Sequence, residues 1–119
     1  MALFACKVGG SEGSSSKQLL FTGTKPFSAQ TVPLDLSDYI GIVIEYNDNP
    51  TTQKNNSCYI DVGVSNVKAV GGYNTTGTTR GAYRTVSVSN TGVTIGDCTF
   101  AGTETGNQYL TPVIYGIHK

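Results

Sequence analysis

The spacing of hydrophobic residues along the chain follows a period of two, which is typical of β-strands. In residues 39–46 (YIGIVIEY), Ile40, Ile42, Ile44 and Tyr46 fall on one face, and the residues between them fall on the other. No window shows a sustained helical period of apolar residues. The pattern therefore predicts an all-β fold. The same alternation recurs in two further segments, with Cys58, Ile60, Val62 and Val64 on one face of the first and Ala82, Arg84, Val86 and Val88 on one face of the second.

Residues 109–119 (YLTPVIYGIHK) form the last strand-like segment, and here both alternating sets are largely apolar. Such a sequence is typical of a strand that is covered on both faces. Because this buried strand is the last segment of the sequence, the sheet is complete only when the last residues are present. We expect a compact module without a tail.

Turn-forming residues divide the chain into short strands. The Asn-Thr-Gly sequence at residues 90–92 is a tight-turn signal and predicts a hairpin between the strands on either side. Roughly eight or nine short antiparallel strands at this spacing predict one β-sandwich domain over residues 1–119, with a jelly-roll-like topology. We expect strands in residues 3–8, 18–23, 27–36, 39–46, 58–65, 66–73, 82–89, 93–100 and 109–119, and loops in residues 9–17 (a flexible Gly/Ser loop), 47–57, 74–79 and 101–107.

The chain carries few charges, and these cancel. Only 13% of its 119 residues are charged, against a usual share of ~25%, and 8 basic and 8 acidic residues give a formal net charge of 0. The basic residues are scattered singly, whereas nucleic acid is attracted by clustered Lys and Arg. We therefore expect no nucleic-acid partner. A net charge near zero gives little repulsion between copies and so favours self-association.

The three cysteines, Cys6, Cys58 and Cys98, each lie in an apolar, strand-like run and form no CxxC pair or Cys/His cluster. They predict buried reduced thiols, and reduced thiols indicate assembly in a cytosol. The sequence LFAC that ends at Cys6 looks like a lipoprotein cleavage site but lacks the basic and apolar leader before it. We expect no signal peptide and no membrane insertion, because no stretch is long enough to cross a bilayer.

Few residues are candidates for catalysis. His118 is the only histidine and lies next to the end of the chain, which suits a solvated residue better than a catalytic base. Glu45 and Asp61 are the best carboxylate pair, since each lies on the minor face of a strong strand and neighbouring strands would bring them together. A polysaccharide hydrolase that uses this pair is the enzymatic alternative, but we favour solvated or ion-paired carboxylates. We expect no catalysis, cofactor or metal.

Tyrosines and asparagines in or near the predicted loops make binding the stronger hypothesis. A tyrosine ring can stack on a sugar while an amide hydrogen-bonds to its hydroxyls, which would suit a neutral glycan. Tyr73 and Asn74 lie at the loop near residue 75, and Tyr83 lies on the Thr/Ser face of its strand. Asn107 and Tyr109 flank the last loop. These five residues are the candidate ligand contacts, although surface exposure without a ligand is the simpler interpretation of each.

Three stretches together resemble small virion modules of phages and prophages of Gram-positive bacteria. They are PLDLSDYIGIVIEYND at residues 33–48, YRTVSVSNTGVTIGDC at residues 83–98 and the closing YLTPVIYGIHK. The opening MALFACKVGG is similar to the start of such reading frames. The resemblance is to a pattern of strand and turn residues and contains no catalytic signature, so it transfers no binding residues to this chain.

In proteins of this kind the module often forms the C-terminal end of a tail-fibre or baseplate protein, where it serves adhesion or trimer formation. The resemblance therefore implies a non-enzymatic virion structural protein that is assembled in the bacterial cytoplasm as a homo-oligomer, with a trimer favoured. Other virion proteins and a host cell-surface glycan are the partners it implies. Because the chain begins with Met1 and has no shaft before the module, a capsid decoration or head-fibre protein is the alternative.

Overall fold

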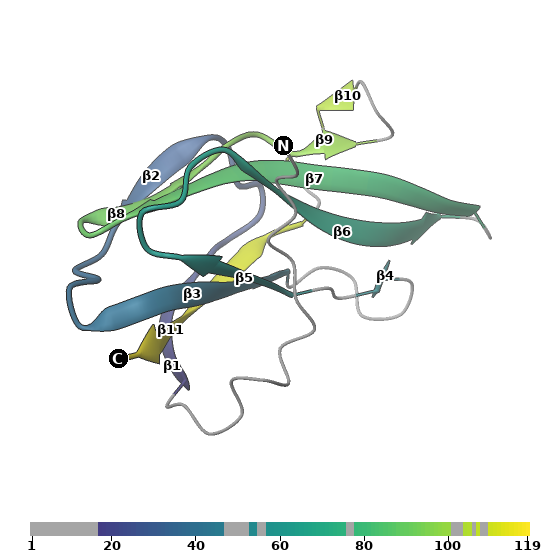
Figure 1. Cartoon of the computed structure of the whole chain (residues 1–119). Coiled ribbons are helices and arrows are strands. Elements are labelled where there is room, and N and C mark those ends of the chain that lie inside the picture. Colours follow the sequence, from purple (N-terminus) through teal and green to yellow (C-terminus); the bar gives the residue numbers. More distant parts are fainter. Residues whose placement is uncertain are drawn as a thin grey trace.

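In a computed structural model, the chain forms two antiparallel β-sheets that lie face to face in a β-sandwich-like arrangement (Figure 1). The structure describes residues 17–46, 53–54, 57–75, 78–100, 104–105, 107 and 110–119. These residues contain eleven strands and no helix, which confirms the predicted all-β class. The strands are β1 (Lys17–Thr22), β2 (Gln30–Pro33), β3 (Tyr39–Tyr46), β4 (Gln53–Lys54), β5 (Cys58–Asp61), β6 (Val67–Thr75), β7 (Thr78–Ser89), β8 (Gly92–Ile95), β9 (Thr99–Phe100), β10 (Glu104–Thr105) and β11 (Pro112–His118).

Strand β11 lies inside the four-stranded sheet, whose strand order is β1-β11-β3-β5. It pairs with β1 along one edge and with β3 along the other. Side chains on both of its faces are buried: Ile114 faces the core and is 0% exposed, while Val113 and Ile117 on the opposite face are 8% and 1% exposed. The prediction of a closing strand that is covered on both faces is confirmed.

The second sheet has seven strands and is built around β7. Strand β6 pairs with one edge of β7, and β8 and β9 pair with different parts of the other edge. Strand β4 extends the sheet beyond β6, β2 extends it beyond β8, and β10 extends it beyond β9. The predicted hairpin between β7 and β8 is confirmed, with Asn90 and Thr91 as its turn.

The β6–β7 hairpin is longer than the sequence predicts. Its pairing continues from Val67 opposite Val86 to Thr75 opposite Thr78. The prediction of a loop at residues 74–79 is therefore wrong for residues 74–75 and 78–79, while residues 76–77 lie outside the described residues. Threonine is β-branched and suits an extended backbone, and the register of the preceding residues continues through this segment. The distal end of the hairpin projects beyond the rest of the sheet (Figure 1).

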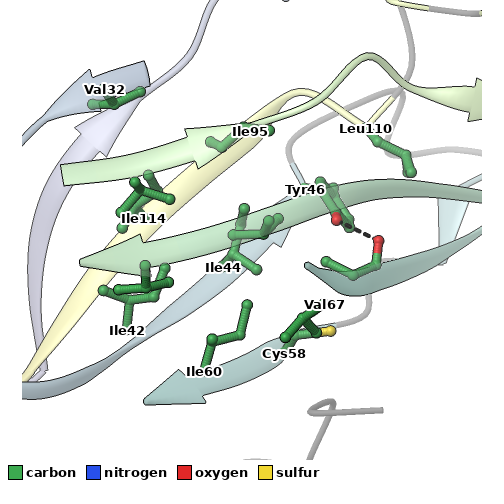
Figure 2. Close-up of a cluster of buried hydrophobic side chains, with 14 of the residues drawn as sticks. Val32, Ile42, Ile44, Tyr46, Cys58, Ile60, Val67, Ile95, Leu110 and Ile114 are labelled. Carbon is green, nitrogen blue, oxygen red and sulfur yellow. Dashed lines mark hydrogen bonds between the residues drawn. The ribbon is translucent and has the colours of Figure 1, made fainter. Parts of the chain in front are cut away.

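The core fills the space between the two sheets (Figure 2). Ile42 and Ile44 on β3 contribute from the four-stranded sheet, and Val86 and Val88 on β7 contribute from the seven-stranded sheet. All four are at most 2% exposed, as the alternation in the sequence predicts. Burial of these side chains is the main contribution that holds the sheets together, since each fully buried aliphatic side chain contributes about 1.5–3 kcal/mol.

Ile40 departs from the alternation of its strand. Gly41 is opposite Ile117 and Tyr39 is opposite His118, so Ile40 is an extra residue on β3 at a β-bulge. The bulge turns its side chain away from the core, and Ile40 is 44% exposed. The prediction that Ile40 shares the buried face of Ile42 is therefore wrong.

The cysteines differ from the prediction of three reduced thiols. Cys58 on β5 is fully buried but takes part in a disulfide. Cys98 is a fully buried thiol, as predicted, and Cys6 lies outside the described residues. The spacing of cysteines along the chain does not show which of them approach one another in the fold, so a disulfide of this kind carries no local sequence signal.

Other predicted strands and loops differ from the observed ones in their boundaries. The strand predicted at residues 58–65 ends at Asp61, because the chain turns at Gly63, whose φ of 102° is a conformation that favours glycine. The strand predicted at residues 93–100 is divided into β8 and β9, and the loop predicted at residues 101–107 contains β10. The strand predicted at residues 3–8 and most of the loop at residues 9–17 lie outside the described residues.

A buried hydrogen bond joins the two sheets. Tyr46 on β3 donates its hydroxyl to the carbonyl oxygen of Ala69 on β6 over 2.6 Å (dashed line in Figure 2). Tyr46→Phe should lower the free energy of unfolding by about 1–2 kcal/mol, because it leaves a buried acceptor without this donor. Urea unfolding measures the effect. Tyr39→Phe is the control: its hydroxyl donates to Gln18 over 3.3 Å in an exposed hydrogen bond, and we expect a loss below about 0.5 kcal/mol. Equal losses for the two variants would contradict the prediction.

Candidate functional site

The predicted ligand contacts that the structure describes lie on different elements of the fold. Tyr73 and Asn74 are neighbours on β6, where they pair with Arg80 and Thr79 in the hairpin. Tyr83 is half-buried on β7, and the Nζ atom of Lys68 lies 4.9 Å from the centre of its ring. Tyr109 lies outside the described residues.

Asn107, the remaining candidate, is held by hydrogen bonds within the fold. Its side-chain oxygen accepts from the backbone N–H of Cys98 over 2.9 Å, and its Nδ2 donates to Asp97 Oδ1 over 3.0 Å. Its backbone oxygen accepts from Phe27 N over 3.0 Å. Because its amide oxygen and nitrogen each make a hydrogen bond within the fold, the Asn107 side chain stabilises the loops around it.

Arg84 is the centre of this loop region and is 0% exposed. Its Nε donates to Leu110 O over 2.8 Å, and one terminal nitrogen donates to Gly96 O over 2.8 Å. The other terminal nitrogen donates to Phe27 O over 2.9 Å and to Asn107 O over 3.4 Å. The guanidinium therefore joins three chain segments that are distant in sequence. In the sequence, Arg84 stands out as a charged residue on an otherwise apolar strand face, but its hydrogen bonds to distant segments were not predicted. We call Arg84 and the residues that accept its hydrogen bonds the Arg84 clasp.

The Arg84 clasp has an acidic neighbour. Asp97 accepts hydrogen bonds from the backbone N–H of Ala29 over 2.8 Å and from the side chain of Asn107. These two hydrogen bonds, with a smaller contribution from the positive charge of Arg84, lower the pKa of Asp97 below its ordinary value of 3.8.

Acid should therefore weaken the fold through Asp97. A carboxyl whose pKa is lower in the folded state stabilises the fold above its unfolded pKa, and this contribution is lost as the pH falls through the folded pKa. We expect the urea midpoint of the wild-type protein to fall as the pH drops below 3.8. Asp97→Asn should be less stable near neutral pH and show a smaller decrease in acid. An unchanged pH profile in the variant would contradict this assignment, and Asp38→Asn, at an exposed aspartate elsewhere, is the control.

The carboxylates of the enzymatic alternative lie apart. Strands β3 and β5 are neighbours, as expected, but Asp61 is opposite Gly41, four residues along β3 from Glu45. Four residues span about 13 Å of a strand, whereas glycosidase carboxyl groups lie roughly 5–9.5 Å apart. Glu45 instead forms an ion pair of 3.3 Å with Lys17, so its carboxylate is neutralised within the fold.

His118 is packed more closely than its position in the sequence suggests. Its Nε2 lies 3.0 Å from Gln18 Oε1, and its ring lies against that of Tyr39 with 4.5 Å between the centres. The residue is half-buried rather than fully solvated, which corrects the prediction. These contacts anchor the end of β11 against β1 and β3.

A shallow depression lies where β2 ends beside the β7–β8 turn. Pro33, Leu34, Asp35, Asn90 and Thr91 line it, and its volume is about 350 Å³. The two segments are tied by backbone hydrogen bonds, from Leu34 N to Thr91 O over 3.1 Å and from Leu36 N to Asn90 O over 2.8 Å. None of its residues was among the candidates, because the sequence does not show that β2 pairs with β8.

Comparison of the chain with known protein families, with curated proteins and with solved structures gives no match. Across the residues that the structure describes, no group of three His, Cys, Asp or Glu side chains is placed to hold a metal ion. The same residues include no helix that is long and apolar enough to cross a membrane. The function must therefore be argued from the surface of this chain.

Proposed function

We propose that the chain is a non-enzymatic structural protein of a phage or prophage virion, of the tail-fibre or baseplate type, which assembles as a homo-oligomer and serves adhesion to a host-surface glycan. The observation that carries the proposal is the distal end of the β6–β7 hairpin. We call this part the arm and define it as residues 74–75 and 78–81.

Among the described residues, no strand pairs with the outer edges of the arm. Strand β4 pairs with β6 only at Gly72 and Tyr73, and β9 pairs with β7 only at Ala82 and Tyr83. Beyond these positions, towards the distal end of the hairpin, β6 and β7 pair only with each other within the described part of the chain. Exposed edges carry N–H and C=O groups that readily pair with another chain. A closed ring of copies, in which each arm pairs with its neighbour, would cover these edges.

A jelly-roll-like topology belongs to the same proposal. Strand β1 pairs with β11 in one sheet, and β2 pairs with β8 in the other. Pairing between the beginning and the end of a chain is what a rolled-up succession of strands produces. The local pairs β3–β5 and β6–β7 lie between these long-range pairs in sequence. Folds of this kind occur in viral capsid proteins, which fits a virion component.

Labelling of purified virions with a gold-conjugated antibody tests where the protein acts. Label at the tail tip or baseplate is the expected result. Label over the head would instead support the alternative of a capsid decoration or head-fibre protein. Virions that carry no label at either place would overturn the assignment to the virion.

The arm can be tested in solution. We expect the full chain to sediment at about three times its mass of 12.5 kDa, since the resemblance favours a trimer. Thr79→Lys places a charge at the open edge and should shift the protein towards the monomer. Thr24→Lys, at an exposed position outside the strands, is the matched control. An oligomer that is unchanged by Thr79→Lys would show that the arm is not the contact.

A further inference from the structure

We propose that the depression between β2 and the β7–β8 turn binds the non-anionic end of a glycan, as a mono- or disaccharide unit. This inference rests on the adhesive role proposed above and names the site and the ligand class. The site is formed by Pro33, Leu34, Asp35, Asn90 and Thr91, and none of these five lining residues is a candidate that the sequence suggested.

The position of the site is fixed by the fold. Strand β2 pairs with β8 in register, with Pro33 opposite Gly92. Beyond this pair, the amides of Leu34 and Leu36 donate to Thr91 O and Asn90 O. Asp35 lies between these two hydrogen bonds, so its backbone is held beside the turn. Because this backbone is already held in place, little conformational entropy is lost when a ligand binds here.

The polar residues that line the depression have unused hydrogen-bonding capacity. Asp35 Oδ1 accepts from both the hydroxyl and the backbone N–H of Ser37, over 2.7 Å and 3.1 Å. These bonds lower the pKa of Asp35 and keep it charged. No described residue hydrogen-bonds to Asp35 Oδ2 or to the Asn90 side chain. The Thr91 hydroxyl lies 3.2 Å from Ser89 Oγ and keeps a second hydrogen-bonding position.

This combination of groups matches a sugar. Pro33 and Leu34 are the apolar lining residues, against which the C–H face of a pyranose ring can pack. Asp35 Oδ2 accepts hydrogen bonds from hydroxyls, and the Asn90 amide both donates and accepts. The volume of about 350 Å³ lies near the small end of the range for ligand sites, roughly 300–1,000 Å³. A small unit therefore fits better than a long chain segment.

The charge of the site selects against acidic ligands. Asp35 is ionised, and no Lys or Arg lines the depression. A phosphate or a sugar carboxylate would meet an unbalanced negative charge, which costs binding free energy. The ligand is therefore a neutral or amino sugar unit rather than a uronic or sialic acid.

Titration of the full chain with sugars, followed by backbone amide NMR, tests the site. The probes are neutral hexoses, N-acetylhexosamines and their disaccharides, with glucuronic acid and N-acetylneuraminic acid as charged comparisons. We expect a neutral sugar to shift the amides of Leu34, Asp35, Asn90 and Thr91, with a dissociation constant in the millimolar range. The acidic sugars should leave these amides unchanged.

Asp35→Asn is the decisive variant, because its amide oxygen can still accept from Ser37 while the free oxygen is lost. It should weaken binding by about tenfold, which corresponds to about 1.4 kcal/mol. Asp38→Asn is the matched control, since Asp38 is an exposed aspartate of the same turn that does not line the depression. If Asp35→Asn fails to fold, Asn90→Ala serves in its place.

Three results would overturn the glycan site: no probe shifts these amides, the acidic sugars bind as well as the neutral ones, or Asp35→Asn binds like the wild type. Failure of this site is distinguishable from failure of the virion proposal. Label on the virion without sugar binding would remove only the site. Sugar binding at the depression without any label on the virion would remove only the assignment to the virion.

Discussion

Arg84→Met is expected to lower the free energy of unfolding by about 3–5 kcal/mol, a large part of the ~5–15 kcal/mol that stabilises a typical domain. Methionine keeps much of the apolar volume of the side chain but has no donor. The carbonyl oxygens of Phe27, Gly96 and Leu110 would each lose a hydrogen bond to the guanidinium. A buried acceptor left without a donor costs about 1–3 kcal/mol.

Urea unfolding, followed by circular dichroism, measures this loss. Arg84→Lys tests the geometry, because a single ammonium group cannot reach the three carbonyl oxygens that lie around the edge of the planar guanidinium. We expect it to recover only part of the lost stability. The control is Lys68→Met, in which an exposed lysine over the ring of Tyr83 is lost, at a cost below about 1 kcal/mol. A loss below about 1 kcal/mol for Arg84→Met would contradict the role of the clasp.

The alternation in the sequence predicted strand faces well. On β7, Ala82, Val86 and Val88 are buried and Ser89 is exposed, as expected. The same face contains Arg84, whose burial could not be predicted because its partners come from segments far away in sequence. A pattern of period two reports which side of a strand faces the core. It does not report which carbonyl groups gather there to satisfy a buried charge.

Strand residues were predicted as a loop where the local composition favours a turn but the register of the hairpin continues. Residues 74–79 are rich in turn-forming and small residues, and this composition predicts a loop. In the structure, Asn74 pairs with Thr79 and Thr75 pairs with Thr78, because a register once set by a hairpin continues along it. Tertiary pairing thus outweighs local preference in the arm.

The candidate site was the least predictable part. Residues 90–92 were correctly interpreted as a turn, but their significance depends on Asp35, more than fifty residues earlier. Only the pairing of β2 with β8 brings Asp35 to the turn. Contacts between strands distant in sequence leave no local pattern.

Ile42→Ala is expected to lower the free energy of unfolding by about 2–5 kcal/mol, because Ile42 is 0% exposed and its truncation leaves a cavity between the sheets. Ile42 lies next to Ile60 of β5 in the register and faces the second sheet with it (Figure 2). Packed neighbours in two sheets can only partly move to fill the space, so the lost contacts add to the lost transfer free energy.

Ile40→Ala is the matched control, since it makes the same chemical change two residues away on the same strand. The sequence pattern assigns both isoleucines to one buried face and would predict equal losses. The bulge exposes 44% of Ile40, so we expect its truncation to cost less than about 1 kcal/mol. Urea unfolding of the two variants therefore distinguishes the bulged strand from a regular one. Losses within about 0.5 kcal/mol of each other would show that Ile40 is buried after all and that β3 has no bulge at this position.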